Sequence, residues 1–170
     1  INAENLVLSA DTIVVCEGEV LGKPTNDHEA REMLRRMRGK SHSVLTALAL
    51  RQKSTGLLLQ DVWHTQVLMR TYSDAEIENY IQSGDYRDKA GGYAIQHKAF
   101  HPVAAVQGCY ANVMGLPLCN LTCLLQHAGI AVEVDIPQAC QRHMGITCEV
   151  YPQILASCMP VSQASRWDSR

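Results

Sequence analysis

Asp11 and Lys23 are the first residues whose types could do chemistry together, as a carboxylate and an ammonium. Asp11 lies inside the apolar run LVLSADTIVV of residues 6–15, and Lys23 follows a dozen residues later, before Pro24. An ionised carboxylate in a half-buried strand is costly unless a cation or hydrogen-bond donors lie nearby. Asp11 is therefore expected to have a partner. A structural ion pair at the end of a sheet is the alternative to a catalytic role.

The register of a predicted hairpin decides whether these two residues meet. Gly18 suits the left-handed last position of a three-residue loop, Cys16–Gly18, and that loop pairs Asp11 with Lys23 on one face. A two-residue loop would instead pair Thr12 with Lys23 and turn Asp11 to the other face. We expect the three-residue loop, with Pro24 ending the second strand near an open rim.

A second charged segment is the run DYRDKAGGYAIQ of residues 85–96, in which Lys89 precedes Gly91 and Gly92. Glycine lets the backbone approach a ligand and turn its N–H groups inward, while lysine adds a point charge. Both features suit an anionic phosphate. A plain Gly-Gly loop is the alternative reading of the same residues.

Helices and strands that could position these residues alternate along the chain, which predicts a mixed α/β sheet with helices packed on it. Capping residues, apolar stripes and terminal glycines predict helices, and β-rich runs predict strands. The predicted elements are helices over 26–39, 73–84 and 117–129 and strands over 42–50, 57–70 and 103–107. Residues 131–170 are expected to hold a short strand or helix and then a loose tail.

Composition narrows the classes of protein to which the chain can belong. The net charge of -2 and pI near 6.4 argue against a general nucleic-acid coat. The longest apolar runs are strand-length, too short to span a bilayer, so we expect no membrane partner. Residues 1–5 show no signal peptide, and we expect a cytoplasmic protein.

The seven cysteines form an odd set with no paired CxxC spacing. We expect reduced intracellular thiols that are mostly buried as small apolar groups. Cys140, His143 and Cys148 are the right residue types for zinc. Their spacing matches no structural zinc pattern, and no fourth ligand is evident, so zinc is the weaker alternative.

Three separated segments together resemble the Maf family of nucleotide pyrophosphatases. They are SADTIVV with GKP (residues 9–15 and 22–24), HSVLT (residues 42–46) and DKAGGYAIQ (residues 88–96), and VMGLPL (residues 113–118) adds the family's late Gly-Leu-Pro helix start. The order and spacing of these segments make the combination specific. The resemblance covers about residues 5–130.

This resemblance implies a mixed, twisted β-sheet with flanking helices in a two-lobed, inosine-triphosphatase-like architecture, with a cleft for a nucleoside triphosphate. It implies a Maf-like pyrophosphatase domain over residues 1–130, N-terminally incomplete, and a C-terminal extension of the same domain over residues 131–170. It also implies a homodimer and no nucleic-acid polymer as a partner.

The implied reaction is hydrolysis between the α- and β-phosphates, which releases a nucleoside monophosphate and pyrophosphate and depends on Mg²⁺ or Mn²⁺. Asp11 matches the catalytic, metal-binding position and is the expected proton acceptor. Thr12 and Gln96 match positions linked to selection of thymidine and uridine triphosphates. Lys23 and Lys89 match lysines that hold phosphate oxygens.

Family members begin with a strand and a Ser-x-Arg-Arg loop that binds phosphate, and neither precedes Ile1. We expect either that residues are missing upstream or that this version lacks half of its phosphate site. The second expectation leads to an alternative function, a catalytically impaired nucleotide-binding protein that regulates cell division. A fragment would also expose an apolar strand edge prone to association.

Overall fold

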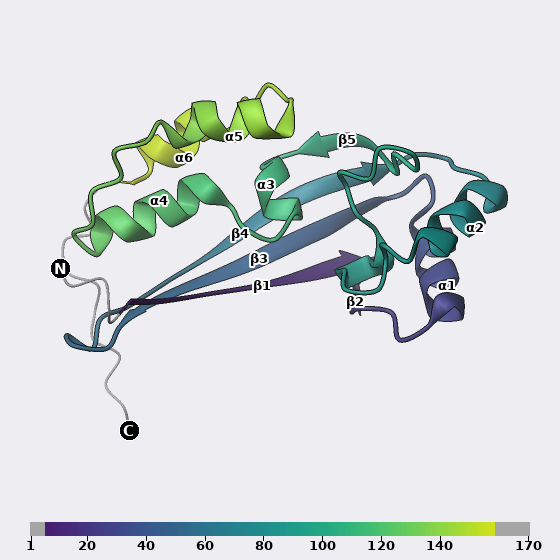
Figure 1. Ribbon diagram of the computed structural model, residues 1–170, viewed down its shortest axis with the longest axis horizontal. Helices are drawn as coiled ribbons and strands as arrows, with labels where there is room; N and C mark the ends of the chain where they lie inside the picture. The colour runs from purple at the N-terminus through teal and green to yellow at the C-terminus, as the bar shows by residue number, and fades with distance from the viewer. Residues whose placement is uncertain (1–5, 159–170) are drawn as a thin grey trace.

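A five-stranded sheet forms the centre of residues 6–158, the part of the chain that the computed structural model describes. The strand order is β2-β1-β3-β4-β5, and all four strand pairs are antiparallel. The strands are β1 (Leu6–Cys16), β2 (Glu19–Leu21), β3 (Ser41–Gln52), β4 (Leu58–Met69) and β5 (Val103–Gln107). The twisted sheet is seen along its length in Figure 1.

The two long strands β3 and β4 confirm the antiparallel pair predicted from the sequence. Alternate residues of β3 are buried from His42 to Gln52, because successive side chains of a strand point to opposite faces. The buried face therefore carries Val44, Thr46 and Leu48 toward the helices.

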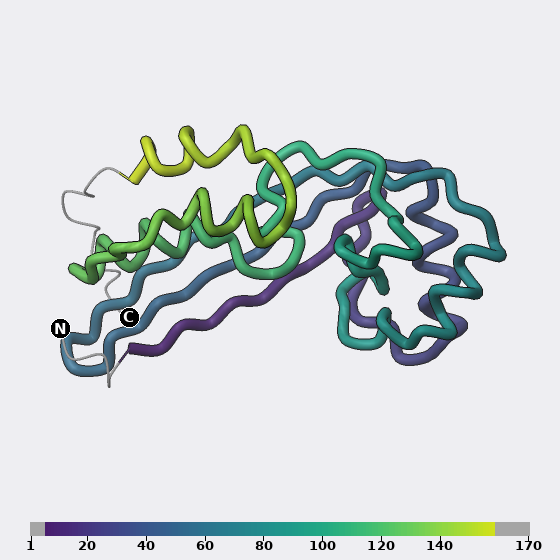
Figure 2. Tube along the Cα trace, turned by 45° about the horizontal axis from the view of Figure 1, so that its top comes forward, coloured from purple at the N-terminus to yellow at the C-terminus, as the bar shows by residue number. Residues whose placement is uncertain are grey.

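The helices form two groups on this face of the sheet. The bounds are α1 (Asp27–Met37), α2 (Asp74–Ser83), the short 3₁₀ helix η2 (Ala90–Gly92), α3 (Tyr110–Val113), α4 (Leu118–His127), α5 (Ile136–Met144) and α6 (Tyr151–Ala156). Figures 1 and 2 show α1 and α2 together at one end, while α4, α5 and α6 run along the other. The expected α/β fold with flanking helices is confirmed.

Local sequence signals explain where the first two helices begin and end. The Asn26 side chain accepts a hydrogen bond from the Glu29 N–H at the start of α1. Ser73 and Glu76 form a complete capping box at the start of α2, and Gly84 ends α2 in the left-handed conformation.

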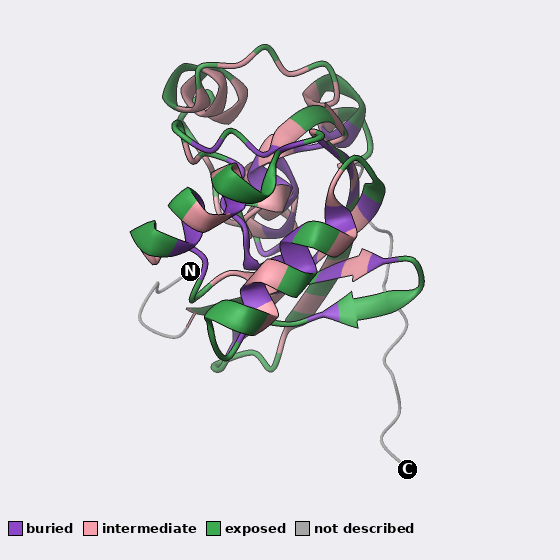
Figure 3. Ribbon diagram, turned by 90° about the vertical axis from the view of Figure 1, so that its right-hand side faces the viewer, coloured by how far each residue is buried: buried purple, intermediate pink, exposed green. Residues whose placement is uncertain are grey.

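Each helix group packs against the sheet through its own hydrophobic cluster. The larger cluster joins α1 and α2 to the sheet through residues such as Val14, Leu34 and Met69. The smaller cluster joins α4 to Leu48 and Leu50 of β3. Figure 3, viewed from the α1–α2 end, shows buried and exposed sides on the same helices. Each helix group thus has its own hydrophobic core against the sheet.

The predicted register of the first hairpin is wrong. Cys16 pairs with Glu19, so the loop has two residues, Glu17 and Gly18. Both have positive φ, 53° and 80°, as the primed two-residue turns that match strand twist require. Since β2 already ends at Leu21, Lys23 lies outside the ladder and the predicted cross-strand partnership of Asp11 with Lys23 does not form.

The expectation that all cysteines are free thiols is also wrong for one pair. Cys123 of α4 and Cys158 form a disulfide, with 5.3 Å between their Cα atoms, and the other five are free. The described part of the C-terminal extension holds two helices, α5 and α6. The loose tail predicted for the end of the chain lies outside the described residues from 159 onward.

The face of the sheet opposite the helices carries apolar side chains that are exposed to solvent. Val7, Leu58 and Val62 are 57%, 53% and 60% exposed. Within the described residues, β1 pairs with β2 only from Val14 to Cys16, so the outer edge of its first part has no partner strand. This edge confirms the expected exposed apolar strand edge. No helix among residues 6–158 is long and apolar enough to cross a membrane.

Candidate active site

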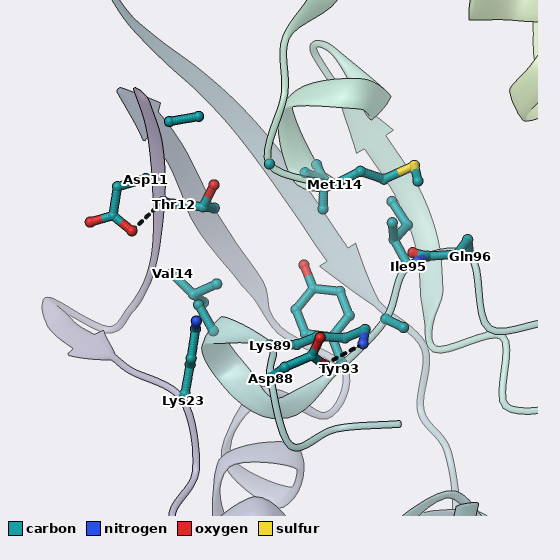
Figure 4. A pocket seen from close by; sticks show the side chains of 15 residues that line it. Asp11, Thr12, Val14, Lys23, Asp88, Lys89, Tyr93, Ile95, Gln96 and Met114 are labelled. Carbon is teal, nitrogen blue, oxygen red and sulfur yellow. Dashed lines mark hydrogen bonds and ion pairs between the residues drawn. The ribbon is translucent and has the colours of Figure 1, made fainter. Parts of the chain in front are cut away.

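A cavity of about 280 Å³ contains all five residues singled out from the sequence: Asp11, Thr12, Lys23, Lys89 and Gln96. Its walls come from β1, from the segment after β2, from residues 88–96 around η2, and from residues 113–115 after α3. The cavity thus lies over β1, between the segment around η2 and the residues after α3 (Figure 4).

A close backbone contact brings the two lysine-bearing segments together. The Gly91 N–H donates to the Gly22 carbonyl at 2.9 Å. Gly91 has φ of 72°, and a Cβ added to it would lie only 3.2 Å from a methyl carbon of Val14. A residue without a side chain is needed here so that the loop with Lys89 can pack against β1 beside Lys23.

The expected role of the glycine N–H groups is wrong. The Gly91 N–H is bonded to Gly22, and the Gly92 N–H donates to the Lys89 carbonyl at 2.9 Å. Neither group points to a ligand. These glycines allow tight packing of the loop, and the positive charge in the cavity comes from side chains.

The two lysines differ in their partners. The Lys89 ammonium lies 2.6 Å from Asp88 and 3.3 Å from Asp85. Burial opposes its charge, but the hydrogen bonds and charges of these two carboxylates raise the pKa of Lys89. Lys23 makes no hydrogen bond or ion pair with any residue of the described chain. Lys23 is therefore the cation most available to an anionic ligand.

Asp11 occupies a different environment from the one expected. It is exposed, although a half-buried position was expected. It lines the cavity at the rim, and one carboxylate oxygen accepts the Thr12 N–H at 3.0 Å. Figure 4 shows its carboxylate on the side of β1 opposite the Thr12 side chain. Water solvates the carboxylate here, so its charge needs no ion-pair partner.

Thr12 is held by a buried polar network. Its hydroxyl lies 2.9 Å from the Thr46 hydroxyl, which in turn donates to the Asn112 carbonyl at 2.9 Å. The hydroxyl hydrogen of Thr46 is engaged in the bond to Asn112, so the Thr12 hydroxyl donates to Thr46. The Thr12 oxygen then remains free to accept a hydrogen bond. Asn112 continues the network by donating to the Val44 carbonyl at 3.1 Å. This network ties α3 to the sheet behind the cavity.

Tyr93 is a cavity residue that the sequence analysis did not single out, although it lies inside the DKAGGYAIQ segment. Its hydroxyl lies 2.8 Å from His42 Nε2, and the two rings meet edge to face. Burial raises the pKa of Tyr93 and lowers the pKa of His42 to about 4. The structural role expected for a histidine at a strand start fits this contact. Asp88 and Met114 also line the cavity and were not predicted.

The carboxylates provide a limited set of metal ligands. No group of three His, Cys, Asp or Glu residues in the described part of the chain is placed to hold a metal ion. The zinc alternative at Cys140, His143 and Cys148 therefore finds no support in these residues. Asp11 and Asp88 offer hard oxygen ligands at the cavity, and Mg²⁺ is commonly bound through one or two carboxylates together with substrate phosphates.

Residues 1–128 match the family model of the Maf-like proteins. The chain belongs to the Maf family. Two similar curated proteins are dTTP/UTP pyrophosphatases. The one from Dictyoglomus thermophilum is 42% identical over 75% of this chain and 66% of its own length. The one from Thermomicrobium roseum is 46% identical over 80% of this chain and 63% of its own length.

A third relative, the dTTP/UTP pyrophosphatase of Desulforamulus reducens, is 42% identical over 78% of this chain and 69% of its own length. This Maf chain thus spans between 63% and 69% of the length of these relatives.

Proposed function

We propose that this Maf-family chain acts in the hydrolysis of pyrimidine nucleoside triphosphates to the monophosphate and pyrophosphate. The observation that supports the proposal is the meeting of five positions from three separate segments in one cavity. The cavity, about 280 Å³, is close to the lower end of the usual range for small-molecule sites. The names of the relatives indicate the substrate class.

Thr12 and Gln96 provide the hydrogen-bonding groups for the base. The free acceptor of the Thr12 hydroxyl suits the N3–H of uracil or thymine. The Gln96 amide carries both donors and an acceptor and can bond the carbonyl groups of the same ring. Cytosine lacks the N3–H and leaves the Thr12 acceptor unpaired, so this site favours uracil and thymine.

Lys23 and Lys89 neutralise phosphate charge. Lys23 is unpaired in the described chain and can bind a phosphate oxygen directly. Lys89 must share its charge with Asp85 and Asp88 and contributes mainly to the potential of the cavity. Charge building on the departing pyrophosphate is stabilised by these ammonium groups.

Asp11 accepts the proton of the attacking water from the rim of the cavity. Because β2 ends opposite Val14, no strand among residues 6–158 pairs with the outer edge of β1 beside Asp11, and a phosphate chain can reach both sides of β1 there. Asp11, with phosphate oxygens of the substrate, would hold Mg²⁺ or Mn²⁺. When bound, the metal ion neutralises phosphate charge.

The test is pyrophosphate release from dTTP and UTP by the complete gene product, with Mg²⁺ or Mn²⁺ added. Asp11→Asn should lower kcat by at least about 100-fold, because loss of a general base costs on the order of 10²–10⁴-fold. Asp61→Asn is the control, since Asp61 also accepts the N–H of the next residue on a strand, lies outside the cavity, and as asparagine keeps an oxygen that can accept from Asn120. Equal turnover by Asp11→Asn and the control would remove Asp11 from the mechanism.

Lys23→Met should weaken nucleotide binding by about tenfold, which corresponds to the loss of one charge-assisted hydrogen bond. Lys53→Met is the control, because Lys53 is exposed in the turn between β3 and β4. Titration calorimetry with dTTP measures both variants. If the two variants bind equally well, Lys23 does not contact the phosphates.

A second candidate is nucleotide binding without turnover. The exposed carboxylate of Asp11 and the absence of a three-ligand metal group in residues 6–158 favour it. Calorimetry that gives saturable dTTP binding, combined with no pyrophosphate release at any metal concentration, would select this function.

A further inference from the structure

Six of the seven cysteines lie between residues 109 and 158, and they fall into two sets of three. Cys109, Cys119 and Cys123 belong to the start of α3 and to α4, inside the family-matched residues. Cys140, Cys148 and Cys158 belong to the segment of residues 131–158, beyond the match. The two sets face each other, because Cys123 and Cys158 form a disulfide and the remaining four line one small cavity.

The cavity between the four thiols is small and largely apolar, with Ile154, Leu118 and Pro137 among its walls. Burial, followed by the neighbouring sulfurs, raises the pKa of Cys119 to about 12, and burial and Cys148 raise that of Cys140. These groups remain protonated thiols in the closed structure. A protonated thiol is a poor nucleophile, so Cys119 and Cys140 react slowly in the closed structure.

The segment of residues 131–158, which packs over the cluster, buries few of its side chains. Among its described residues, 131–158, only Ile154 is buried, and α5 contains no buried residue. The Ile154 carbonyl lies close to both disulfide sulfurs, 3.9 Å from Cys123 and 3.5 Å from Cys158. The disulfide therefore links the segment to α4 beside Ile154, the single buried residue among residues 131–158.

We propose that the Cys123–Cys158 disulfide is a redox-controlled link, and that its reduction releases the α5–α6 segment and opens the cavity that the four thiols line. The proposal concerns residues 109–158 and does not depend on the proposed catalytic function. It assigns the segment a specific reactant class, small dithiols and disulfides.

The chemical step is thiol–disulfide exchange. A thiolate of a small dithiol attacks one sulfur of the disulfide and displaces the other cysteine as a thiolate, which takes up a proton. The second thiol of the reagent then closes its own disulfide and releases the first cysteine. Two electrons pass from the dithiol to the protein, and oxidised glutathione reverses the reaction by the same exchange.

The experiment compares thiol labelling in the full chain before and after treatment with dithiothreitol, which is removed before N-ethylmaleimide is added. Peptide mapping by mass spectrometry follows each cysteine. Labelling of Cys140 and Cys148 should accelerate about tenfold, because opening of the cavity lets the reagent and water reach both thiols. Cys16, buried in β1, is an internal control whose rate should not change.

In the Cys158→Ser variant, N-ethylmaleimide should label Cys140 and Cys148 rapidly without any reductant. Cys16→Ser is the matched control variant and should keep both the slow rate and the response to dithiothreitol. Hydrogen exchange distinguishes release from unfolding, because amides of α5 and α6 should exchange faster in Cys158→Ser while those of β3 keep their protection. The proposal is overturned if reduction leaves the Cys140 and Cys148 rates unchanged, or if β3 loses protection together with α5 and α6.

Discussion

At the back of the cavity, His42 shows how a single buried residue controls the dependence of stability on pH. Its Nε2 contacts the Tyr93 hydroxyl, and its Nδ1 has no partner among the described residues. Protonation would add a charge and a second N–H that needs an acceptor in a site that is 2% exposed. The folded protein therefore holds His42 in its neutral form at neutral pH.

The pKa of His42 predicts acid sensitivity. The folded value of about 4 is below the ordinary 6.5, so the unfolded state binds the extra proton first. The stabilisation is present above pH 6.5 and is lost as pH falls toward 4, by about 3 kcal/mol in total. Chemical denaturation at a series of pH values between 6.5 and 4 measures this decrease in the free energy of unfolding.

His42→Gln should flatten the pH dependence in this window, because an amide does not titrate there. His28→Gln, on the exposed side of α1, is the control and should retain the full slope. A slope unchanged by His42→Gln would show that other groups cause the acid sensitivity. The carboxylates with lowered pKa, such as Glu76 at about 2, act at lower pH.

At the scale of elements, the register of β1 against β3 determines which residues of β1 face the cavity. Thr12 and Val14 lie opposite Thr46 and Val44 on the helix-covered face of β3, so Asp11 lies on the other face. Had the loop contained three residues, Asp11 would have paired with Lys23. The turn thus decides which residues of the following segment lie beside β1.

Gly18→Ala should therefore destabilise the protein by about 1 kcal/mol, because a side chain is disfavoured at φ of 80°. Gly22→Ala is the matched control, since Gly22 is not left-handed and a Cβ there meets no atom within 4 Å. Its effect should stay within about 0.5 kcal/mol. Thermal and denaturant unfolding measure both, and equal losses would contradict the assigned turn.

For the whole molecule, the distribution of helices is one-sided. Both helix groups pack on the same face of the sheet, which leaves the opposite face and the outer edge of β1 uncovered by residues 6–158. An open edge of mostly apolar residues is a template for pairing with a further strand. Asp11 is the single charged side chain between Leu6 and Cys16 that could discourage such pairing.

The chain of residues 1–170 should consequently associate as its concentration rises. Val7→Lys should shift this association to about tenfold higher concentration, because a charge on the strand must be desolvated for pairing. Val134→Lys is the control, since Val134 is 63% exposed but lies before α5, off the sheet. Analytical ultracentrifugation distinguishes them, and identical association of the two variants would contradict a role for the open edge.

Several features of this protein were determined by the sequence alone. The Asn26 cap, the Ser73 and Glu76 capping box and the alternation through β3 are local signals, so α1, α2 and β3 formed as predicted. The short motifs of the Maf resemblance singled out five residues, and these line one cavity. Local signals succeed here because hydrogen bonds and side-chain periodicity act within a few residues.

Tertiary structure alone decided the face on which Asp11 lies, the partners of the Gly91 and Gly92 N–H groups, and the pairing of Cys123 with Cys158. A slip of one residue in a turn reverses every side chain of a strand, and the sequence near Gly18 is compatible with both registers. The contact of His42 with Tyr93 joins residues 51 positions apart. Such contacts depend on how distant elements pack, which no local pattern specifies.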